Sequence, residues 1–192
     1  MKSLMRPLQL ICLTALIVIC AQAQQQPSPA QTTSAKPAAS ANPLSNDIKG
    51  LYTMVKGYVM RAAEKMPEDQ YSFKPTPEVR SFGQVVGHIA DAQYLFCAPI
   101  RGEKNPEPNV EKNKTSKADL VQALKDGFAY CDSVYDGMTD QQAAQMVSFF
   151  GRDRTKLGLL AFNSSHNHEH YGNLVTYMRL KNLVPPSSEG SR

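Results

Sequence analysis

Apolar side chains recur at intervals of three and four positions over most of residues 44–184, which is the spacing of helices with one buried face. Proline, glycine and polar stretches interrupt this pattern at several points and divide it into separate segments. The segments predict four amphipathic helices, over about 51–66, 82–96, 117–136 and 156–181.

Residues that typically start and stop helices support these limits. Ser81 and Gln84 have the spacing of a capping box ahead of the second helix, and Ser116 with Asp119 forms a similar pair ahead of the third. The fourth helix ends before the paired prolines 185 and 186, which cannot continue it.

Two weaker signals lie between the third and fourth helices. Thr139 and Gln142 predict a short helix, and the run from Val147 to Phe150 before Gly151 indicates an extended piece or a turn. Strand patterns are otherwise scarce. Four amphipathic helices joined by loops predict an all-α domain, an up-and-down four-helix bundle with a metal site between its helices.

The first 23 residues have the layout of a signal peptide rather than of a structural element. A basic start with Lys2 and Arg6 precedes an apolar run, and Ala21-Gln22-Ala23 is a small-x-small cleavage site. The apolar run is shorter than the roughly 20 residues of a membrane span, although a retained anchor is the alternative. We therefore expect a periplasmic or secreted protein that begins at Gln24 and has no stable membrane span after processing.

The chain then divides into a linker, a domain and a tail. Residues 24–43 are rich in Gln, Ala, Ser and Pro and predict a disordered linker, because they offer little apolar surface to bury. The folded domain is expected over 44–184, and 185–192 form a C-terminal tail. Two cysteines remain after cleavage, Cys97 and Cys131, and whether they form a disulfide is left open because bridging depends on their distance in the fold.

Charge and composition narrow the classes of molecule that the protein is expected to bind. The chain has 21 Lys and Arg against 17 Asp and Glu, with a charged fraction of 20%. It contains no polybasic arm, no zinc-finger cysteine spacing and no glycine-rich phosphate loop. We expect no nucleic acid partner, and expect instead a small-molecule substrate or ligand, with a homodimer left open.

Three of the four histidines fall within five residues of the fourth predicted helix. His166 and His170 lie one turn apart, about 40° around the helix axis, so one cation can contact both. His168 lies about 200° away from His166 and is expected to face solvent. Two imidazoles on a buried stripe, which we expect to include Leu159 and Phe162, are costly without partners, and a divalent cation satisfies both.

The third ligand is expected to be His88, on the apolar stripe of the second helix. A histidine in such a stripe is often only a hydrogen-bonded core residue, but three imidazoles on facing helices leave one open position on a tetrahedral ion, as in catalytic sites. Imidazole-only ligation suits zinc, nickel, copper or iron. Asp91 and Asn173 each follow a ligand by three residues and are candidates for orienting a ring N–H.

A rival motif overlaps this pair. Residues 166–170 also read H-x-x-E-H, the signature of inverted zinc metalloproteases. Those enzymes take a further acidic ligand downstream, and the only acid left here is Glu189 in the tail, so the match is interpreted as accidental. Glu169 nevertheless lies about 60° from His166 on the helix and is a candidate proton handler beside the ion, together with Asp91.

The segment MPEDQYSFKPTPEVRSFGQVVGHIADAQ, followed far downstream by HNHEHYGNLVTYMRLKNLVPPSS, resembles the DinB-like (DinB/YfiT) superfamily of four-helix bundle proteins. The resemblance implies a divalent metal, zinc or nickel, held by His88, His166 and His170, with His168 outside the ligand set. Asn173 stands where many members have glutamine.

Characterised relatives within the resemblance activate a small-molecule thiol at the metal. The chain is therefore expected to be a metal-dependent enzyme of the S-transferase or hydrolase type that activates a thiol or water. Alternatives of other classes are a non-catalytic, stress-related module that binds a metal or small ligand, and a protein whose metal only joins two helices.

Overall fold

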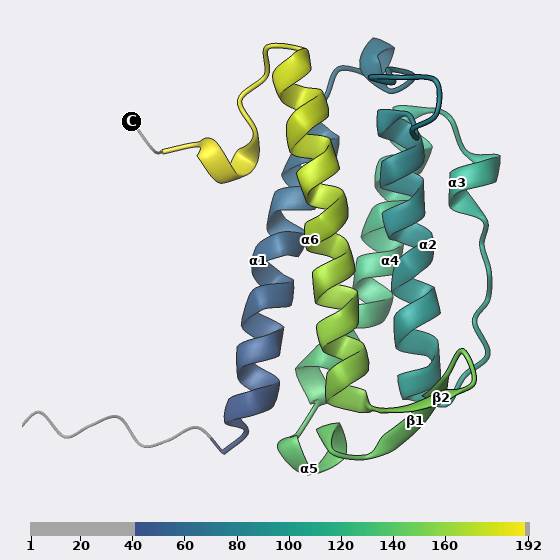
Figure 1. Cartoon of the computed structure of the whole chain (residues 1–192), viewed down its shortest axis with the longest axis vertical. Helices are drawn as coiled ribbons and strands as arrows, with labels where there is room; N and C mark the ends of the chain where they lie inside the picture. The colour runs from purple at the N-terminus through teal and green to yellow at the C-terminus, as the bar shows by residue number, and fades with distance from the viewer. Residues whose placement is uncertain (1–40, 191–192) are drawn as a thin grey trace, which may run out of the picture. The chain divides into compact units, whose positions relative to one another are not determined.

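The computed structural model describes residues 41–190, so the expected signal peptide and nearly all of the linker lie outside the described residues. Four long helices form a bundle, α1 (Pro43–Lys65), α2 (Phe82–Arg101), α4 (Lys117–Gly137) and α6 (Lys156–Leu180) (Figure 1). Shorter elements connect or follow them: η1 (Glu68–Gln70), α3 (Val110–Asn113), α5 (Asp140–Ala143), β1 (Met146–Phe149), β2 (Arg152–Thr155) and η2 (Pro186–Ser188). The helical bundle expected from the sequence is confirmed.

The predicted helix caps are present. The Ser81 hydroxyl accepts a hydrogen bond from the Gln84 backbone amide, and the Gln84 side-chain oxygen accepts one from the Ser81 backbone amide, which completes a capping box. Ser116 caps α4 through the Asp119 amide, and the predicted pair of Thr139 and Gln142 caps α5. Such caps supply partners to amides that have none within the helix, and they fix where α2 and α4 begin.

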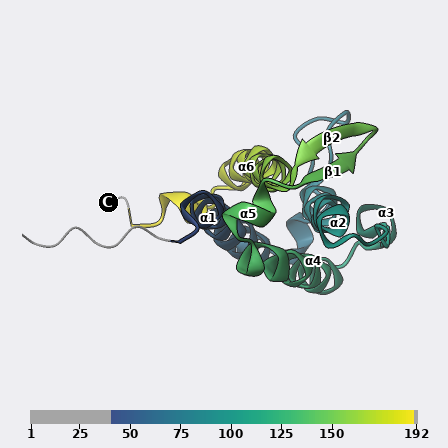
Figure 2. The same ribbon diagram turned by 90° about the horizontal axis from the view of Figure 1, so that it is seen from below.

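The four helices do not alternate strictly in direction. Lys117, at the start of α4, donates to the carbonyls of Glu64 and Met66 at the end of α1, so α1 and α4 run antiparallel. The end of α6 lies beside the end of α1, where Lys65 donates to the Val184 carbonyl. The order up, down, down, up therefore replaces the alternating order expected from the sequence, because the connection from α2 to α4 runs back along α2 (Figures 1 and 2).

Two elements besides the 3₁₀ turns η1 and η2 were not expected. The extended piece after Met146 is confirmed as β1, but it pairs with a second strand, β2, whose Arg-Asp-Arg-Thr sequence has no strand pattern. Phe150 and Gly151 form the turn, both with positive φ, as a tight hairpin requires. The other new element is α3, a single turn within the polar stretch that was expected to be only a loop.

The buried face of α6 differs from the expected one. In α6, Phe162 was expected on the buried stripe and is 43% exposed, so that expectation was wrong. The inward face of α6 instead carries polar residues among its leucines, which a reading based on apolar spacing does not detect.

These polar residues form a network at the centre of the bundle. Asn163 donates to Gln93 at 3.2 Å, and Gln93 donates to Asn167 at 2.9 Å, which joins α6 to α2. Asn167 also donates to Asn163, and Gln93 donates to the Ile89 carbonyl. All three amides are completely buried. Because a buried amide without partners is costly, this network fixes the rotation of α6 and thereby the position of the adjacent histidines.

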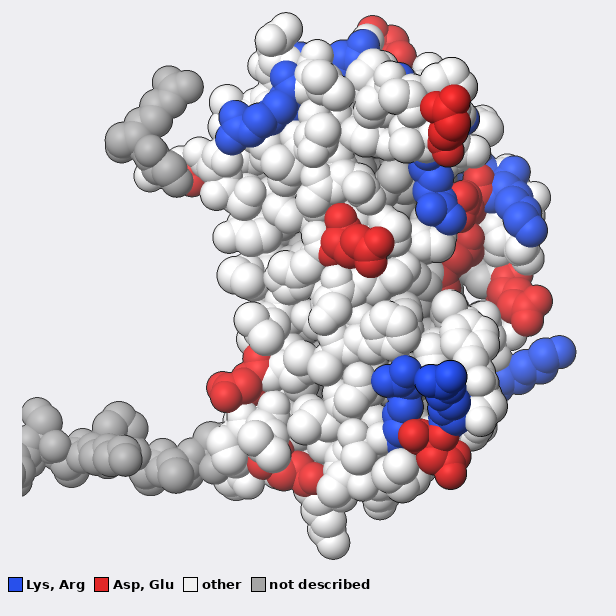
Figure 3. Space-filling view, in the orientation of Figure 1, with Lys and Arg blue, Asp and Glu red and all other residues white. Residues whose placement is uncertain are grey.

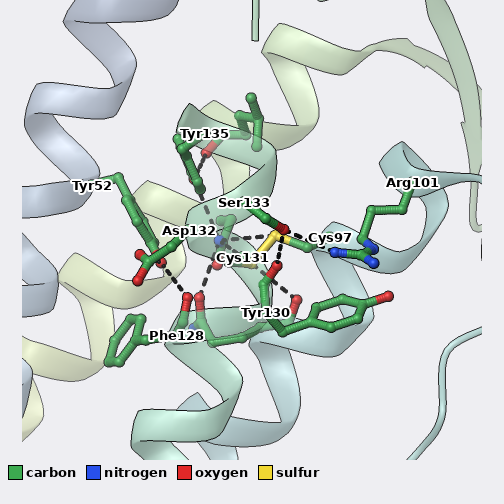
Figure 4. Close-up of a disulfide and its surroundings, with 12 residues drawn as sticks. Tyr52, Cys97, Arg101, Phe128, Tyr130, Cys131, Asp132, Ser133 and Tyr135 are labelled. Carbon is green, nitrogen blue, oxygen red and sulfur yellow. Dashed lines mark hydrogen bonds between the residues drawn. A yellow bond between two sulfur atoms is a disulfide. The ribbon is translucent and has the colours of Figure 1, made fainter. Parts of the chain in front are cut away.

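A disulfide joins α2 to α4 beside this network. Cys97 and Cys131 have Cα atoms 5.5 Å apart, within the distance that a disulfide spans (Figure 4). Tyr52 of α1 stacks on Tyr135 of α4 with ring centroids 3.8 Å apart. The pairing of the two cysteines, left open by the sequence, is therefore decided by the packing of α2 on α4.

The start and the end of the described chain are held to the bundle. Asp140 accepts hydrogen bonds from the amides of Leu44 and Ser45 at the start of α1. In the segment expected to be a tail, Pro186 is buried, and Tyr171 of α6 hydrogen-bonds to Ser187. Across residues 41–190, no helix has the length and apolar character needed to cross a bilayer.

Gly127 of α4 allows the close approach of α2 and α4. A Cβ added at this position would lie 2.8 Å from the Ala90 carbonyl oxygen, a backbone atom that cannot move aside alone. We expect Gly127→Ala to lower the free energy of unfolding by about 1–3 kcal/mol, the usual cost of overpacking. Gly50→Ala is the matched control, because its Cβ would meet nothing within 4 Å in α1 and should stabilise by about 0.5–1 kcal/mol. Urea denaturation measures both; equal effects would contradict the packing argument.

Candidate metal centre

Three histidine side chains meet between α2 and α6 near the middle of the bundle. The Nε2 atom of His166 lies 3.2 Å from Nε2 of His88 and 3.1 Å from Nε2 of His170. Ligand atoms of all three lie within 4.8 Å of one another. The structure therefore brings together the three residues that the sequence identified as a ligand set.

The helix geometry explains which histidines of α6 take part. His166 and His170 are one turn apart and point toward α2, whereas His168 is exposed and lies 2.7 Å through Nδ1 from the Ser164 carbonyl oxygen of its own helix. The outward direction expected for His168 is confirmed.

Two of the rings are oriented by groups on their far side. The Nδ1 atom of His88 lies 2.9 Å from Glu111 Oε2, and Nδ1 of His170 lies 3.1 Å from Asn173 Oδ1. A carboxylate oxygen and an amide carbonyl oxygen accept hydrogen bonds, so each Nδ1 carries the hydrogen. In the neutral rings this leaves the Nε2 lone pairs of His88 and His170 directed at the shared point. Asn173 thus has the orienting role that the sequence suggested.

This arrangement suits a cation better than it suits hydrogen bonding. Nε2 of His166 can donate one hydrogen, so at most one of its two short contacts can be a hydrogen bond. Its Nδ1 is buried and has no hydrogen-bond partner among the described residues. Ligands about 2.0–2.1 Å from a tetrahedral ion lie roughly 3.3 Å apart, close to the Nε2 separations observed here. The donor set and its spacing therefore fit a divalent cation with three imidazole ligands.

The surroundings keep two of the rings in the form that binds metals. Burial, together with the neighbouring His170 and His88, lowers the pKa of His166 from 6.5 to about 3. Burial also lowers the pKa of His170, although the hydrogen bond that its ring donates to Asn173 acts in the opposite direction. Both rings are neutral at neutral pH, and only the neutral imidazole has a free lone pair for a cation.

The lowered pKa of His166 has a consequence for stability in the metal-free protein. Between pH about 3 and about 6.5 the unfolded chain binds a proton at this ring that the folded chain does not, so stability should fall as the pH drops through this range and be fully present above it. Urea denaturation with a chelator at several pH values measures this slope. His166→Gln removes the titrating ring and should flatten the slope; an identical slope in both proteins would contradict the assignment.

A cavity of about 170 Å³ lies beside the histidines. His88 and His166 form part of its wall, and the remaining lining residues come from α2 and the loop before α3: Asp91, Ala92, Leu95, Asn105, Glu107, Pro108 and Asn109. The ring of Phe96 packs edge-on against that of His166, with ring centroids 5.4 Å apart. A small molecule in this cavity would therefore adjoin the two rings that line it.

The two predicted proton handlers lie differently. Asp91 lines the cavity, but its carboxylate oxygens accept the amides of Val110 and Glu111, at 2.8 and 3.0 Å. The ring N–H of His88 that Asp91 was expected to orient is held by Glu111 instead, because the Asp91 carboxylate faces the start of α3. Glu169 is exposed, and within residues 41–190 no hydrogen bond joins it to the three rings. Their catalytic roles stay predictions.

Sequence reasoning missed Glu111 as a member of this site. It lies 23 positions after His88, inside a stretch of lysines, asparagines and prolines without periodicity. Nothing in the sequence separates this glutamate from the other charged residues near it. Only the path of the connection along α2 brings it to the ring.

Charged side chains on the face seen in Figure 3 are mixed in sign. Lys and Arg lie next to Asp and Glu in most places, and much of the surface between them is uncharged. This face therefore presents no extended patch of one charge.

Comparisons with known proteins agree with the fold. The family model described as the DinB superfamily matches residues 52–174. An uncharacterised protein, YjoA of Bacillus subtilis, is 30% identical over 138 residues, which are 70% of this chain and 89% of YjoA. The crystal structure of that DinB-like protein superposes with a TM-score of 0.59 at 26% identity, covering 71% of this chain and 92% of YjoA.

Two further solved structures share the fold at lower identity. A DinB-like protein from Bacillus cereus has a TM-score of 0.65 at 19% identity, over 73% of this chain and 95% of the other. A mycothiol-dependent maleylpyruvate isomerase has a TM-score of 0.57 at 14% identity, over 68% of this chain and 60% of the isomerase. At these identities the likeness concerns the fold alone.

Proposed function

The chain belongs to the DinB superfamily, and from this premise we propose that it is an exported, metal-dependent enzyme that activates a thiol or a water molecule, of the S-transferase or hydrolase type. One observation carries the proposal: the Nε2 atoms of His88 and His170 each lie within 3.2 Å of Nε2 of His166, beside a cavity with room for a small ligand. Zinc or nickel is the cation we propose for this site, since imidazole ligands suit both.

The residues of the chain supply the ligands and their orientation. His88, His166 and His170 present imidazole nitrogen atoms, and Glu111 and Asn173 hold two of the rings from behind. When bound, a divalent cation lowers the pKa of a thiol or water at its open position, so that a nucleophile forms at neutral pH. Asp91 and Glu169 are the proposed proton handlers; Asp91 already lies in the cavity wall.

One structural neighbour supports the proposal that the activated nucleophile is a thiol. The isomerase named above is described as mycothiol-dependent, which means that a small thiol takes part in its reaction. Low-molecular-weight thiols are concentrated in the reducing cytosol, so an exported enzyme of this kind would need another source of thiol. Hydrolysis needs only water, and it therefore stays beside thiol transfer in the proposal.

Export is proposed from the first 23 residues, and a disulfide between Cys97 and Cys131 supports it, because such bonds persist mainly outside the cytosol. N-terminal sequencing of protein recovered from outside the cytoplasm should give Gln24. A chain recovered intact from Met1 would contradict cleavage.

A second candidate is a module that binds a metal or small ligand without catalysis. It is favoured by one observation: within residues 41–190 no hydrogen bond joins either proposed proton handler to the rings, because the Asp91 carboxylate accepts the amides of α3 and Glu169 is exposed. Such a protein would bind a cation or a small ligand and would catalyse no reaction.

Assays on the metal-loaded protein distinguish the metal-dependent enzyme from the non-catalytic binding module. We expect one ion per chain, and thiol transfer to an electrophile or ester hydrolysis that is lost in His88→Ala and kept in His168→Ala. Binding of one ion without turnover by either nucleophile would favour the second candidate. Absence of metal binding would contradict the enzyme and the metal-binding form of the second candidate.

A further inference from the structure

The single turn α3 serves to place one carboxylate against His88. We propose that Glu111 is a positioning residue, which fixes the tautomer and orientation of His88 and thereby raises the affinity of the three-histidine site for a divalent cation. The inference rests on the proposed metal site and extends it to a segment of the chain outside the four helices.

The contacts of Glu111 define this role. Its Oε2 atom lies 2.9 Å from His88 Nδ1, and its Oε1 atom accepts a hydrogen bond of 2.8 Å from Arg80 Nε. Arg80 is anchored in turn, because its carbonyl oxygen accepts from the Tyr177 hydroxyl of α6 at 2.8 Å. The carboxylate is therefore held on both sides and has little freedom to leave the ring.

The backbone of α3 is held as firmly as the side chain. Both carboxylate oxygens of Asp91 accept backbone amides of α3, those of Val110 and Glu111. The Val110 side chain is 2% exposed and packs in the core cluster. At Gly87, one position before His88, an added Cβ would lie 2.8 Å from Glu111 Cα, so the two segments touch through their backbones.

These contacts assign separate tasks to two acidic residues. Glu111 touches the ring on the side opposite its Nε2 atom, so it acts behind His88 and not as a fourth ligand. Asp91 acts on the ring only indirectly, because its carboxylate holds the backbone of α3. A carboxylate behind a metal-binding histidine fixes the ring and raises its basicity, and removing such a partner typically weakens metal affinity about 10–100-fold.

Zinc affinity of purified variants, measured by competition with a chelator, tests the role. Glu111→Ala should bind zinc about 10–100-fold more weakly while still taking up one ion per chain. Glu111→Gln keeps an oxygen that can accept from His88 Nδ1 and should recover much of the loss. Lys112→Ala is the matched control, since Lys112 is exposed on the same turn and should leave the affinity unchanged.

A second measurement does not depend on the metal. Long-range ¹H–¹⁵N NMR spectra of the metal-free protein report which nitrogen of His88 carries the hydrogen. We expect His88 to carry the hydrogen on Nδ1 in the wild type and in Glu111→Gln, and to shift toward Nε2–H in Glu111→Ala. A purely structural defect in α3 that leaves the fold intact would not produce this shift.

The outcomes separate this inference from the proposed function. If Glu111→Ala matches wild type in zinc affinity and in the His88 tautomer, the positioning role is wrong and the three-histidine site stands. If Glu111→Ala takes up no zinc at all, as expected for His88→Ala, then Glu111 is a ligand and the inference also fails. If the wild type binds neither zinc nor nickel, the proposed function itself fails.

Discussion

Replacing His88, His166 or His170 by alanine should abolish tight binding of a divalent cation, whereas His168→Ala should retain about one ion per chain. The reason is geometric. The three inward rings converge through their Nε2 atoms, separated by 3.1–3.2 Å along the two measured contacts, and two imidazoles cannot hold an ion as three do. His168 points to solvent from the same helix and serves as the matched control.

The loss of metal should also appear in thermal stability. A cation that binds only the folded state, at a concentration of 100 times its Kd, stabilises by about 2.7 kcal/mol, which raises the Tm by roughly 5–10 °C in a domain of this size. This increment should vanish in the three ligand variants and persist in His168→Ala, whose own stability should change by no more than about 0.5 kcal/mol. Elemental analysis and calorimetry measure the two quantities. Metal lost from His168→Ala and kept by His166→Ala would overturn the assigned site.

Removing the disulfide should produce the second large effect, on stability rather than on metal binding. Cys97 and Cys131 are separated by 34 positions. A disulfide that closes a loop of this length stabilises the folded protein by about 3–4 kcal/mol, because it lowers the conformational entropy of the unfolded chain. The double variant Cys97→Ala, Cys131→Ala should therefore unfold at a clearly lower urea concentration. Both sites are fully buried, so loss of packing adds to the effect.

Metal content should survive the same change. Cys97 lies nine positions after His88, roughly 13 Å further along α2 and on its opposite side, so its sulfur cannot reach the ion. Cys131 is on α4, which contributes no ligand to the cluster. The same holds for either single replacement by serine. Elemental analysis of the folded variants checks this expectation, and a folded variant without metal would show that the ligand assignment is wrong.

The sequence by itself determined the helices and the ligands of the candidate centre. Helix periodicity and caps are local properties, so residues such as Ser81 and Ser116 revealed where helices begin. The relative directions of His166, His168 and His170 also follow from the helix repeat alone, since residues four apart share a face and residues two apart do not. Local geometry was therefore sufficient to separate His168 from the other two histidines, whereas the packing of α6 decided which of these directions is inward.

The tertiary structure alone decided what depends on contacts between distant segments. The buried amides of Gln93 on α2 and of Asn163 and Asn167 on α6 interrupt the apolar patterns of these helices, and their pairing across the two helices is what makes their burial stable. Glu111 reaches His88 because the connection after α2 returns along it, a path that no spacing rule encodes. The short distance between Cys97 and Cys131 likewise follows from the packing of α2 on α4. Contacts between side chains that are far apart in the sequence depend on how their helices pack.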